Sequence, residues 1–336
     1  MMQNRGIFVI LAIHGHEQTY DKNTRRARIA LSVAALGLLT WGLTLGGMQI
    51  PAVARWLIHV QLLPAAASFA LIIFVAWVAV TLVFGRVYCS SVCPLGTLMD
   101  ILGYAGRIPH TDGLPRNPRR RYRYARPRTP LRYIILTITL TCLIGGFMAI
   151  PAIIDPYTVY ERFCLSLLHP AWCAITGADP TIPPEAEIIE NAYPPLMISM
   201  SSMAGALISL ASIMVIALVS IISGRTICNT ICPVGTTLGM VSRYSIFQMD
   251  IDTDLCINCR RCEDACKGNC IDLQDHTVDS SRCVVCFDCT AVCPNKAIRY
   301  TASRKQLSIP MMQRIGRQGS LTGQSTAITK IAKTKN

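Results

Sequence analysis

Charged residues are scarce in this chain. Asp, Glu, Lys and Arg make up 15% of its 336 residues, against about 25% in a typical soluble protein, while hydrophobic residues make up 51%. Acidic residues are the scarcer class, 19 against 32 basic residues, and the formal net charge is +13. The mean hydropathy is +0.40. This composition argues against a soluble protein and indicates that much of the chain faces lipid.

Charge is almost absent from four long apolar runs. They cover residues 29–50, 62–84, 131–153 and 196–222, and the one charged residue among them is Arg132. About 20 apolar residues cross the hydrocarbon core as a helix. The sequence therefore predicts four transmembrane helices. Buried helices of a soluble protein are the alternative, but such helices rarely repeat this length without charge.

Basic residues lie almost entirely on one side of this predicted arrangement. All of them except Arg55 and Arg162 fall in residues 1–28, in residues 85–132 or after residue 222. Lys and Arg favour the cytoplasmic side of a membrane. We therefore expect a multi-pass protein of the inner (cytoplasmic) membrane with both termini in the cytoplasm. The positive charge is then a topology signal, which argues against a nucleic-acid partner and leaves membrane lipids as one.

Half of the 16 cysteines form two runs with identical spacing in a polar segment, residues 250–300. Each run reads Cys-x2-Cys-x2-Cys-x3-Cys, and in two-cluster ferredoxins the fourth cysteine of one run completes the cluster of the other. We predict two [4Fe–4S] clusters in a ferredoxin domain. The first takes Cys256, Cys259, Cys262 and Cys293, and the second takes Cys283, Cys286, Cys289 and Cys266.

Zinc and disulfide bonds are the alternatives for these eight cysteines. Zinc sites use pairs of ligands separated by a longer loop, and disulfides are disfavoured in a reducing cytoplasm. Short apolar segments at 270–273 and 297–300 fit a pseudo-symmetric pair of ferredoxin units. The first run departs from the common pattern at two positions. Lys267 stands where proline usually follows, and Cys270 is an additional thiol that we interpret as a packing residue.

The second and fourth predicted spans end in nearly the same sequence. Residues 85–97 read GRVYCSSVCPLGT and residues 224–236 read GRTICNTICPVGT, identical at seven of thirteen positions. Cysteines at i and i+4 share a helical face, and the proline after them is expected to bend or end the helix. Repeated membrane units often place a shared site on their pseudo-symmetry axis.

This repeat predicts a further centre near the cytoplasmic boundary of the membrane, either an iron–sulfur cluster or another metal. Its ligands are expected to be the CxxxCP cysteines Cys89, Cys93, Cys228 and Cys232. Turn-shaping motifs that bind no metal and reversible thiol–disulfide exchange stay open as alternatives.

The predicted fold is an α-helical membrane protein with four transmembrane helices in a pseudo-symmetric two-helix repeat, joined to a small α+β ferredoxin domain. The expected divisions are a basic cytoplasmic N-terminal segment (1–28), a four-helix membrane domain (29–249), a two-cluster ferredoxin domain (250–300) and a flexible basic tail (301–336).

Four spans, two CxxxCP motifs and a pair of ferredoxin motifs resemble the NapH/NosR/MauN family of ferredoxin-type membrane proteins, over roughly residues 29–300. NapH is a quinol dehydrogenase membrane component. The resemblance implies electron transfer linked to quinol. It also implies a redox partner such as a multihaem cytochrome, an iron–sulfur subunit or an exported reductase.

The outer loop after the third predicted span contains a second group of candidate residues. Cys164 and Cys173 are candidates for a disulfide, with unpaired thiols or a ligand role as alternatives. Asp155, Tyr157 and His169 are candidates for proton release at a quinol site, although ordering the loop is the preferred interpretation.

The chain has no nucleotide-binding, flavin-binding or nucleophile motif. Quinol oxidation is therefore the one bond-changing reaction that we expect. The expected function is iron–sulfur electron transfer between the quinone pool and a redox partner, in a direction that the sequence leaves open. A maturation or assembly reductase for another metalloenzyme and a redox sensor are the alternatives.

Overall fold

The computed structural model describes residues 3–44, 52–61, 71–107, 122–147, 149–177 and 203–302. It describes side chains from residue 23 onward, except those of residues 52, 55, 71, 107, 149, 203 and 204. Parts of all four predicted spans (45–50, 62–70, 148 and 196–202) and residues 303–336, most of the predicted tail, lie outside the described residues.

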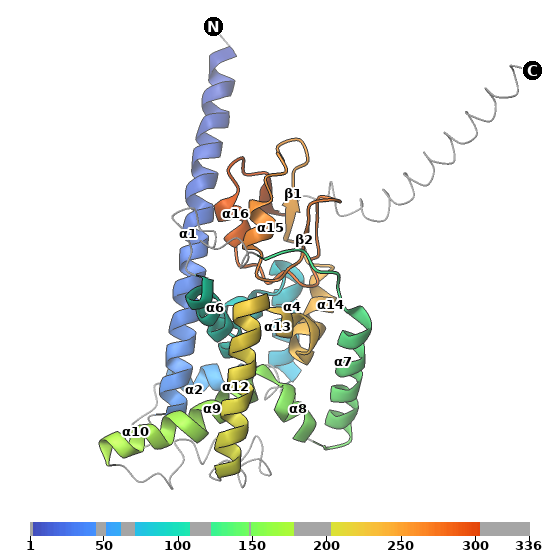
Figure 1. Ribbon diagram of the computed structural model, residues 1–336. Helices are drawn as coiled ribbons and strands as arrows, with labels where there is room; N and C mark the ends of the chain where they lie inside the picture. The colour runs from blue at the N-terminus through green and yellow to red at the C-terminus, as the bar shows by residue number, and fades with distance from the viewer. Residues whose placement is uncertain are drawn as a thin grey trace, which may run out of the picture.

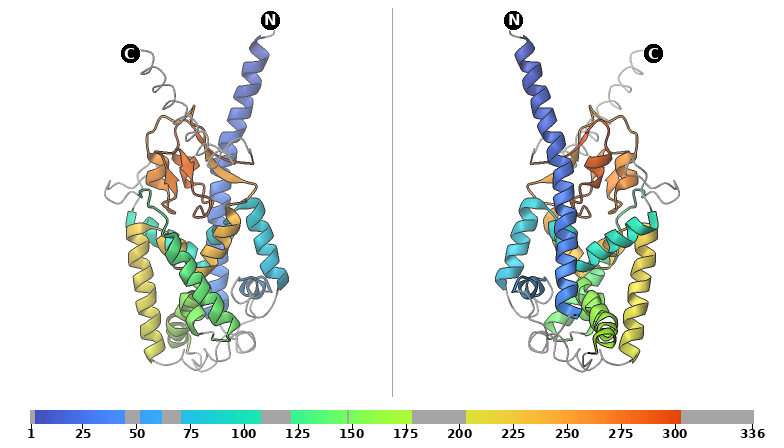
Figure 2. Two further views of the ribbon diagram at one scale, coloured as in Figure 1. Left: turned by 90° about the vertical axis from the view of Figure 1, so that its right-hand side faces the viewer. Right: turned by 90° about the vertical axis from the view of Figure 1, so that its left-hand side faces the viewer.

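Helices make up most of the described chain, and the small ferredoxin region lies at one end of them (Figure 1). The helices before that region are α1 (Gln3–Thr44), α2 (Ala52–His59), α4 (Leu71–Phe84), α5 (Val87–Ser91), α6 (Pro94–Arg107), α7 (Thr129–Ile144), α8 (Ala149–Ile154), α9 (Pro156–Phe163), the π-helical turn η2 (Cys164–Leu168), α10 (His169–Thr176), α12 (Met203–Ser223), α13 (Thr226–Thr230) and α14 (Pro233–Ser242). Helix α1 runs past both the other helices and the ferredoxin region (Figure 2).

Two helical segments are long and apolar enough to cross a membrane, Asn23–Thr44 and Gly205–Ser223. Two further apolar segments, Ile72–Phe84 and Thr129–Ile144, are shorter. The described residues thus contain two candidate spans, and the predicted set of four is not confirmed.

The third predicted span is not one continuous helix. Helix α7 ends at Ile144, Gly146 has a φ of 76°, and α8 begins at Ala149. Glycine adopts this left-handed conformation without steric cost and commonly ends a helix. The prediction of a single helix over 131–153 is wrong because of this turn.

The predicted outer loop begins as a helix. The Asp155 carboxylate accepts hydrogen bonds from the backbone N–H groups of Tyr157 and Thr158, which caps α9. The helical run continues through η2 into α10. Pro170 has no N–H and its ring crowds the carbonyl four residues earlier, and the π-helical turn accommodates it.

The ferredoxin region consists of two similar α+β units. Strand β1 (Gln248–Ile251) pairs antiparallel with β4 (Ile298–Thr301), and β2 (Ile271–Asp272) pairs with β3 (Thr277–Val278). Helices α15 (Arg261–Ala265) and α16 (Asp288–Val292) start 27 residues apart, the same offset as the two cysteine runs. Their shared core contains the buried Met249, Ile251, Ile271 and Ile298.

The helical part also contains a repeat, in which α4–α5–α6 corresponds to α12–α13–α14. Helices α4 and α12 end 139 residues apart, and each is followed by a left-handed glycine, Gly85 (φ 74°) or Gly224 (φ 68°). The third helix of each unit begins at the proline of the CxxxCP motif. The repeating unit therefore has three helices, where the sequence indicated two.

Candidate functional site

The two cysteines of each CxxxCP motif lie in different local structures. Cys89 is inside α5, whereas Cys93 follows the end of that helix and directly precedes Pro94, the first residue of α6. Cys232 is likewise extended (φ −66°, ψ 120°) before α14. The prediction that the pair shares one helical face is wrong, because the chain leaves the helical conformation between the two cysteines.

The second cysteine of each motif caps the following helix. Cys232 Sγ accepts a hydrogen bond from the Gly235 N–H at 3.2 Å, and Cys93 interacts with the Gly96 N–H in the same way. A helix N-terminus favours a negative charge. Burial nevertheless raises the pKa of both thiols well above the ordinary value. A bound metal, which takes the deprotonated form, is what would hold them as thiolates.

Glycine is required where each capped helix passes over the preceding turn. A Cβ on Gly96 would lie 2.5 Å from the carbonyl oxygen of Cys89, and a Cβ on Gly235 would meet the carbonyl oxygen of Cys228 even more closely. The same close approach in both halves shows that the two turns have the same shape.

The four CxxxCP cysteines are brought together in one buried core. Cys89, Cys93, Cys228 and Cys232 share it with Met99, Leu238 and Val284. Within the described residues, no three His, Cys, Asp or Glu side chains are arranged to hold a single metal ion. A cubane cluster is wider than an ion, so its four thiolates lie farther apart. The four cysteines match a cubane in number and chemistry.

Two buried arginines cross between the halves of the repeat. Arg225 donates to the carbonyl oxygens of Cys89 (2.6 Å) and Gly96 (3.0 Å). Arg86 donates to Asn229 Oδ1 (2.8 Å), and its Nη2 lies 3.8 Å from Cys89 Sγ. Burial by itself lowers the pKa of Arg86, but the neighbouring thiol groups raise it above its ordinary value. Positive charge is therefore fixed beside the cysteines.

The cysteine loops of the ferredoxin region have an alternating backbone. Asn258 and Arg260 have positive φ (55° and 60°), and so do Val285 and Phe287 (52° and 61°), at the offset of 27. Such alternation turns successive backbone N–H groups toward one point and forms a concave anion-binding site, called a nest. Nests of this kind surround many anionic iron–sulfur clusters. Both loops therefore have the backbone that a cluster requires.

The two predicted ligand sets are brought together as separate groups. Cys256, Cys259, Cys262 and Cys293 line one pocket together with Pro294. In the second group, Cys289 interacts electrostatically with Cys286, Cys283 and Cys266. The fourth cysteine in each group comes from the other run, and the ligand roles themselves stay a proposal.

Cys270 lies beside the second group. Its side chain is buried, and its Sγ is 3.4 Å from Cys266 Sγ. The sequence indicated a packing residue and missed this contact. The sequence feature that could have indicated this contact is the position of Cys270, four residues after Cys266.

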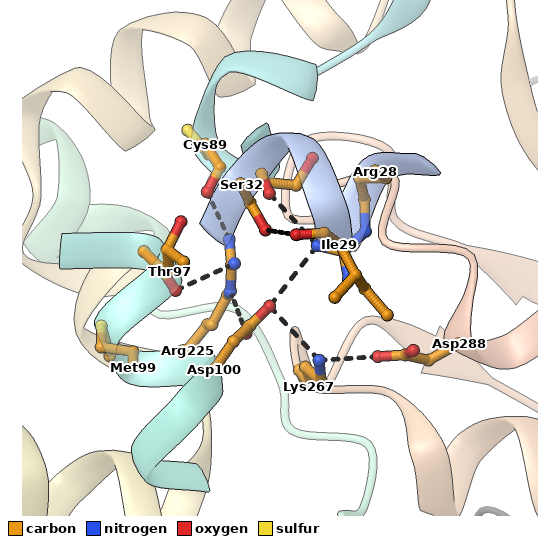
Figure 3. Close-up of polar contacts among 12 residues, drawn as sticks. Arg28, Ile29, Ser32, Cys89, Thr97, Met99, Asp100, Arg225, Lys267 and Asp288 are labelled. Atoms are coloured by element: carbon orange, nitrogen blue, oxygen red, sulfur yellow. Dashed lines mark hydrogen bonds and ion pairs between the residues drawn. The ribbon is translucent and has the colours of Figure 1, made fainter. Parts of the chain in front are cut away.

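A network of charges joins the ferredoxin region to the helices (Figure 3). Asp100 on α6 pairs with Arg225 (2.8 Å), Lys267 (3.3 Å) and Arg28 on α1 (3.5 Å). Lys267 also pairs with Asp288 (2.8 Å). Burial alone lowers the pKa of Lys267, but the two carboxylates raise it above its ordinary range. In the sequence, Lys267 was noticed only because it stands where proline usually follows the fourth cysteine of the run.

Cys164 and Cys173 do not form a disulfide in the structure. Both are buried free thiols, and they lie nine residues apart on the continuous run from α9 to α10. At about 1.5 Å per residue, a helix separates them by more than the ~7 Å that a disulfide allows. This separation rules out the candidate disulfide in the structure. Cys173 Sγ instead lies 3.6 Å from His169 Nε2.

Parts of this chain are similar in sequence to known proteins. The family described as "4Fe-4S binding domain" matches residues 67–110 and 206–251, the two segments that contain the CxxxCP motifs. An uncharacterised protein of Methanocaldococcus jannaschii is 36% identical over 78 residues, 23% of this chain and 31% of that protein. No solved structure matches.

Two further relatives have names that describe a function. YccM of Escherichia coli, named as an electron transport protein, is 24% identical over 237 residues, 69% of this chain and 55% of YccM. The pyruvate synthase subunit PorD of Methanothermobacter marburgensis is 34% identical over 67 residues, 20% of this chain and 82% of PorD. The chain thus spans about a third of the length of the Methanocaldococcus jannaschii protein and about half of the length of YccM. It belongs to the iron–sulfur electron-transfer proteins and carries a 4Fe-4S binding domain.

Proposed function

We propose that this chain is a membrane electron-transfer protein that links the quinone pool to a redox partner. It does so through a centre held by the four CxxxCP cysteines and two [4Fe–4S] clusters held by the ferredoxin region. The observation that carries the proposal is the packing of Cys286 against the buried core of the CxxxCP cysteines. A ferredoxin thiol and the membrane-side thiols thus belong to one continuous structure.

The residues divide into three ligand sets. One set is Cys89, Cys93, Cys228 and Cys232, the second is Cys283, Cys286, Cys289 and Cys266, and the third is Cys256, Cys259, Cys262 and Cys293. Clusters bound there would supply reversible one-electron transfer. The match of both CxxxCP segments to a 4Fe-4S binding domain supports the first set.

The three sets are linked in order by neighbouring side chains. Arg225 interacts with both Cys228 of the first set and Cys286 of the second. Cys289 of the second set interacts with Cys262 of the third. These interactions support a relay in which the three sets act in series, from the helical core to the ferredoxin region.

The surface of the helices supports a membrane location. Ile72 on α4, Ile144 on α7 and Ile222 on α12 are 87%, 80% and 66% exposed. Large exposed apolar surfaces mark contact with a membrane or a partner. Together with the basic loops, they favour a multi-pass protein of the inner membrane with the ferredoxin region in the cytoplasm.

The resemblance to NapH-type proteins supports quinol as one reactant, and the name of YccM supports electron transfer. They also favour a redox protein, such as a multihaem cytochrome, an iron–sulfur subunit or an exported reductase, as the partner.

The centre held by the four CxxxCP cysteines is called the membrane-side centre below. Replacing Cys89 and Cys228 by serine tests it. The double variant is expected to lose about four iron atoms per chain and to keep the ferredoxin spectrum, because cubane clusters contain four irons. Iron analysis and EPR spectroscopy of anaerobically purified protein measure both. Cys142→Ser, a cysteine of α7 outside all three sets, is the matched control. Unchanged iron content in the double variant would contradict the proposal.

A further inference from the structure

Arg86 and Arg225 occupy equivalent positions in the repeat but differ in their charge partners. Arg225 Nε forms an ion pair with Asp100 at 2.8 Å. Arg86 is fully buried and forms no ion pair with a carboxylate among the residues that the structure describes. It donates to Asn229 Oδ1, to the carbonyl oxygen of Ser281 and, at 3.8 Å, to Cys89 Sγ. Its Nε has no partner within the described chain.

The difference arises from one position of the repeat. The residue that corresponds to Asp100 is Gly239. A Cβ at Gly239 would lie 2.5 Å from the Ser281 carbonyl oxygen and 2.8 Å from Arg132 Nη2. The place of the carboxylate is therefore taken by a carbonyl group and a second cation, and no acidic side chain fits there.

Asp279, two residues before Ser281, does not compensate Arg86. Asp279 forms an ion pair with Arg282 at 2.7 Å and accepts hydrogen bonds from the N–H and hydroxyl groups of Ser281. Arg132 adds positive charge, since it shares the Ser281 carbonyl oxygen with Arg86. A buried charge without a counter-charge is strongly unfavourable, so an anion close to Arg86 would stabilise its charge.

The CxxxCP thiols are the groups that can supply this anion. Arg86 Nη2 lies 3.8 Å from Cys89 Sγ, and Arg86 also interacts electrostatically with Cys228 and Cys232 of the other half of the repeat. Resting on the proposed function, we infer that Arg86 is the counter-cation of the thiolate centre and sets its reduction potential. A fixed positive charge favours the reduced form, which carries one more electron. Arg225 also interacts with Cys228 and Cys93, but its charge is partly offset by the ion pair with Asp100.

Charge-changing substitutions at the two positions test this role. Arg86→Gln removes the cation, and the membrane-side centre is expected to become harder to reduce. The expected change in its reduction equilibrium constant is at least tenfold, which equals about 59 mV for one electron. Arg86→Lys keeps the charge and is expected to hold the wild-type potential. Asp100→Asn removes a negative charge and is expected to shift the potential in the opposite direction to Arg86→Gln.

The measurement is an EPR-monitored redox titration with iron analysis, on full-length protein purified anaerobically. An unchanged potential in Arg86→Gln would overturn the inference. So would loss of the centre in both Arg86 variants, since that result assigns the residue a structural role only. Wild-type protein that lacks the membrane-side centre altogether would overturn the proposed function as well, which distinguishes the two failures.

Discussion

Asp155 is a buried carboxyl group that caps α9 and accepts a third hydrogen bond from the Thr158 hydroxyl group. Burial raises its pKa from 3.8 to about 6 despite these hydrogen bonds. The native state therefore binds a proton more tightly than the unfolded state does. The contribution to stability is complete below the unfolded pKa and is lost as the pH rises through the folded value.

Asp155→Asn is expected to remove this pH dependence while keeping the cap, because asparagine also caps helices well. Relative to wild type, the variant should gain about 1.4 kcal/mol between pH 5 and pH 8. Unfolding in detergent at the two pH values measures the difference, and Asp275→Asn at an exposed position is the control. A constant difference between the variant and wild type at both pH values would contradict the raised pKa.

Gly96→Ala is expected to disrupt the first CxxxCP turn, because the new Cβ would approach the Cys89 carbonyl oxygen at 2.5 Å. The backbone on both sides has to move, so we predict loss of the iron bound at that centre and lower stability by about 2–3 kcal/mol. Iron analysis and thermal unfolding check both effects. Gly37→Ala, where nothing lies within 4 Å of the added atom, should retain full iron content.

The residues that bear the chemistry were visible in the sequence because cysteine spacing is dictated by local backbone geometry. The runs from Cys256 and Cys283 predicted both units of the ferredoxin region, and the repeat of 139 residues pointed to the second set of thiols. Lys267, Asp100 and Asp288 were not predicted as a network. They are far apart in sequence, and only tertiary packing brings them together.

At the scale of elements, the network around Asp100 connects α1 and α6 to both ferredoxin units. Asp100 has three cationic partners, and its own side chain is 14% exposed. Its removal leaves those cations with less counter-charge in a site of low polarity.

Asp100→Asn is therefore expected to lower the free energy of unfolding by about 3 kcal/mol and to loosen the ferredoxin region. Hydrogen exchange of α15 and α16 should rise relative to wild type. Asp254→Asn, at an exposed position, serves as the matched substitution. Equal exchange rates in the two variants would show that the network does not hold the region in place.

Element boundaries were predicted less well than motifs. Hydropathy alone treated residues 131–153 as one span, but the Gly145–Gly146 turn divides it into α7 and α8. The segment after Asp155 contains charged residues and prolines typical of a loop, yet its cap and packing form helices. Periodicity and composition report burial, whereas single glycines and caps decide where a helix ends.

At the scale of the whole molecule, two internal repeats meet. The helical repeat presents its CxxxCP turns to the ferredoxin repeat, and Val284 and Cys286 of the latter pack into the core of the former. Helix α1 contacts both parts through Arg25 with Asp288 and Arg28 with Asp100. This joint arrangement was beyond the sequence, because neither repeat contains information about the other.

The most direct test is a redox titration of anaerobically purified protein, monitored by EPR, with iron analysis and with a reduced quinol analogue added. Three clusters predict about 12 iron atoms per chain and reduction of the clusters by the quinol analogue. A content of about eight iron atoms, with clusters that the quinol analogue leaves oxidised, would contradict a relay that runs from the membrane-side cysteines to the ferredoxin region.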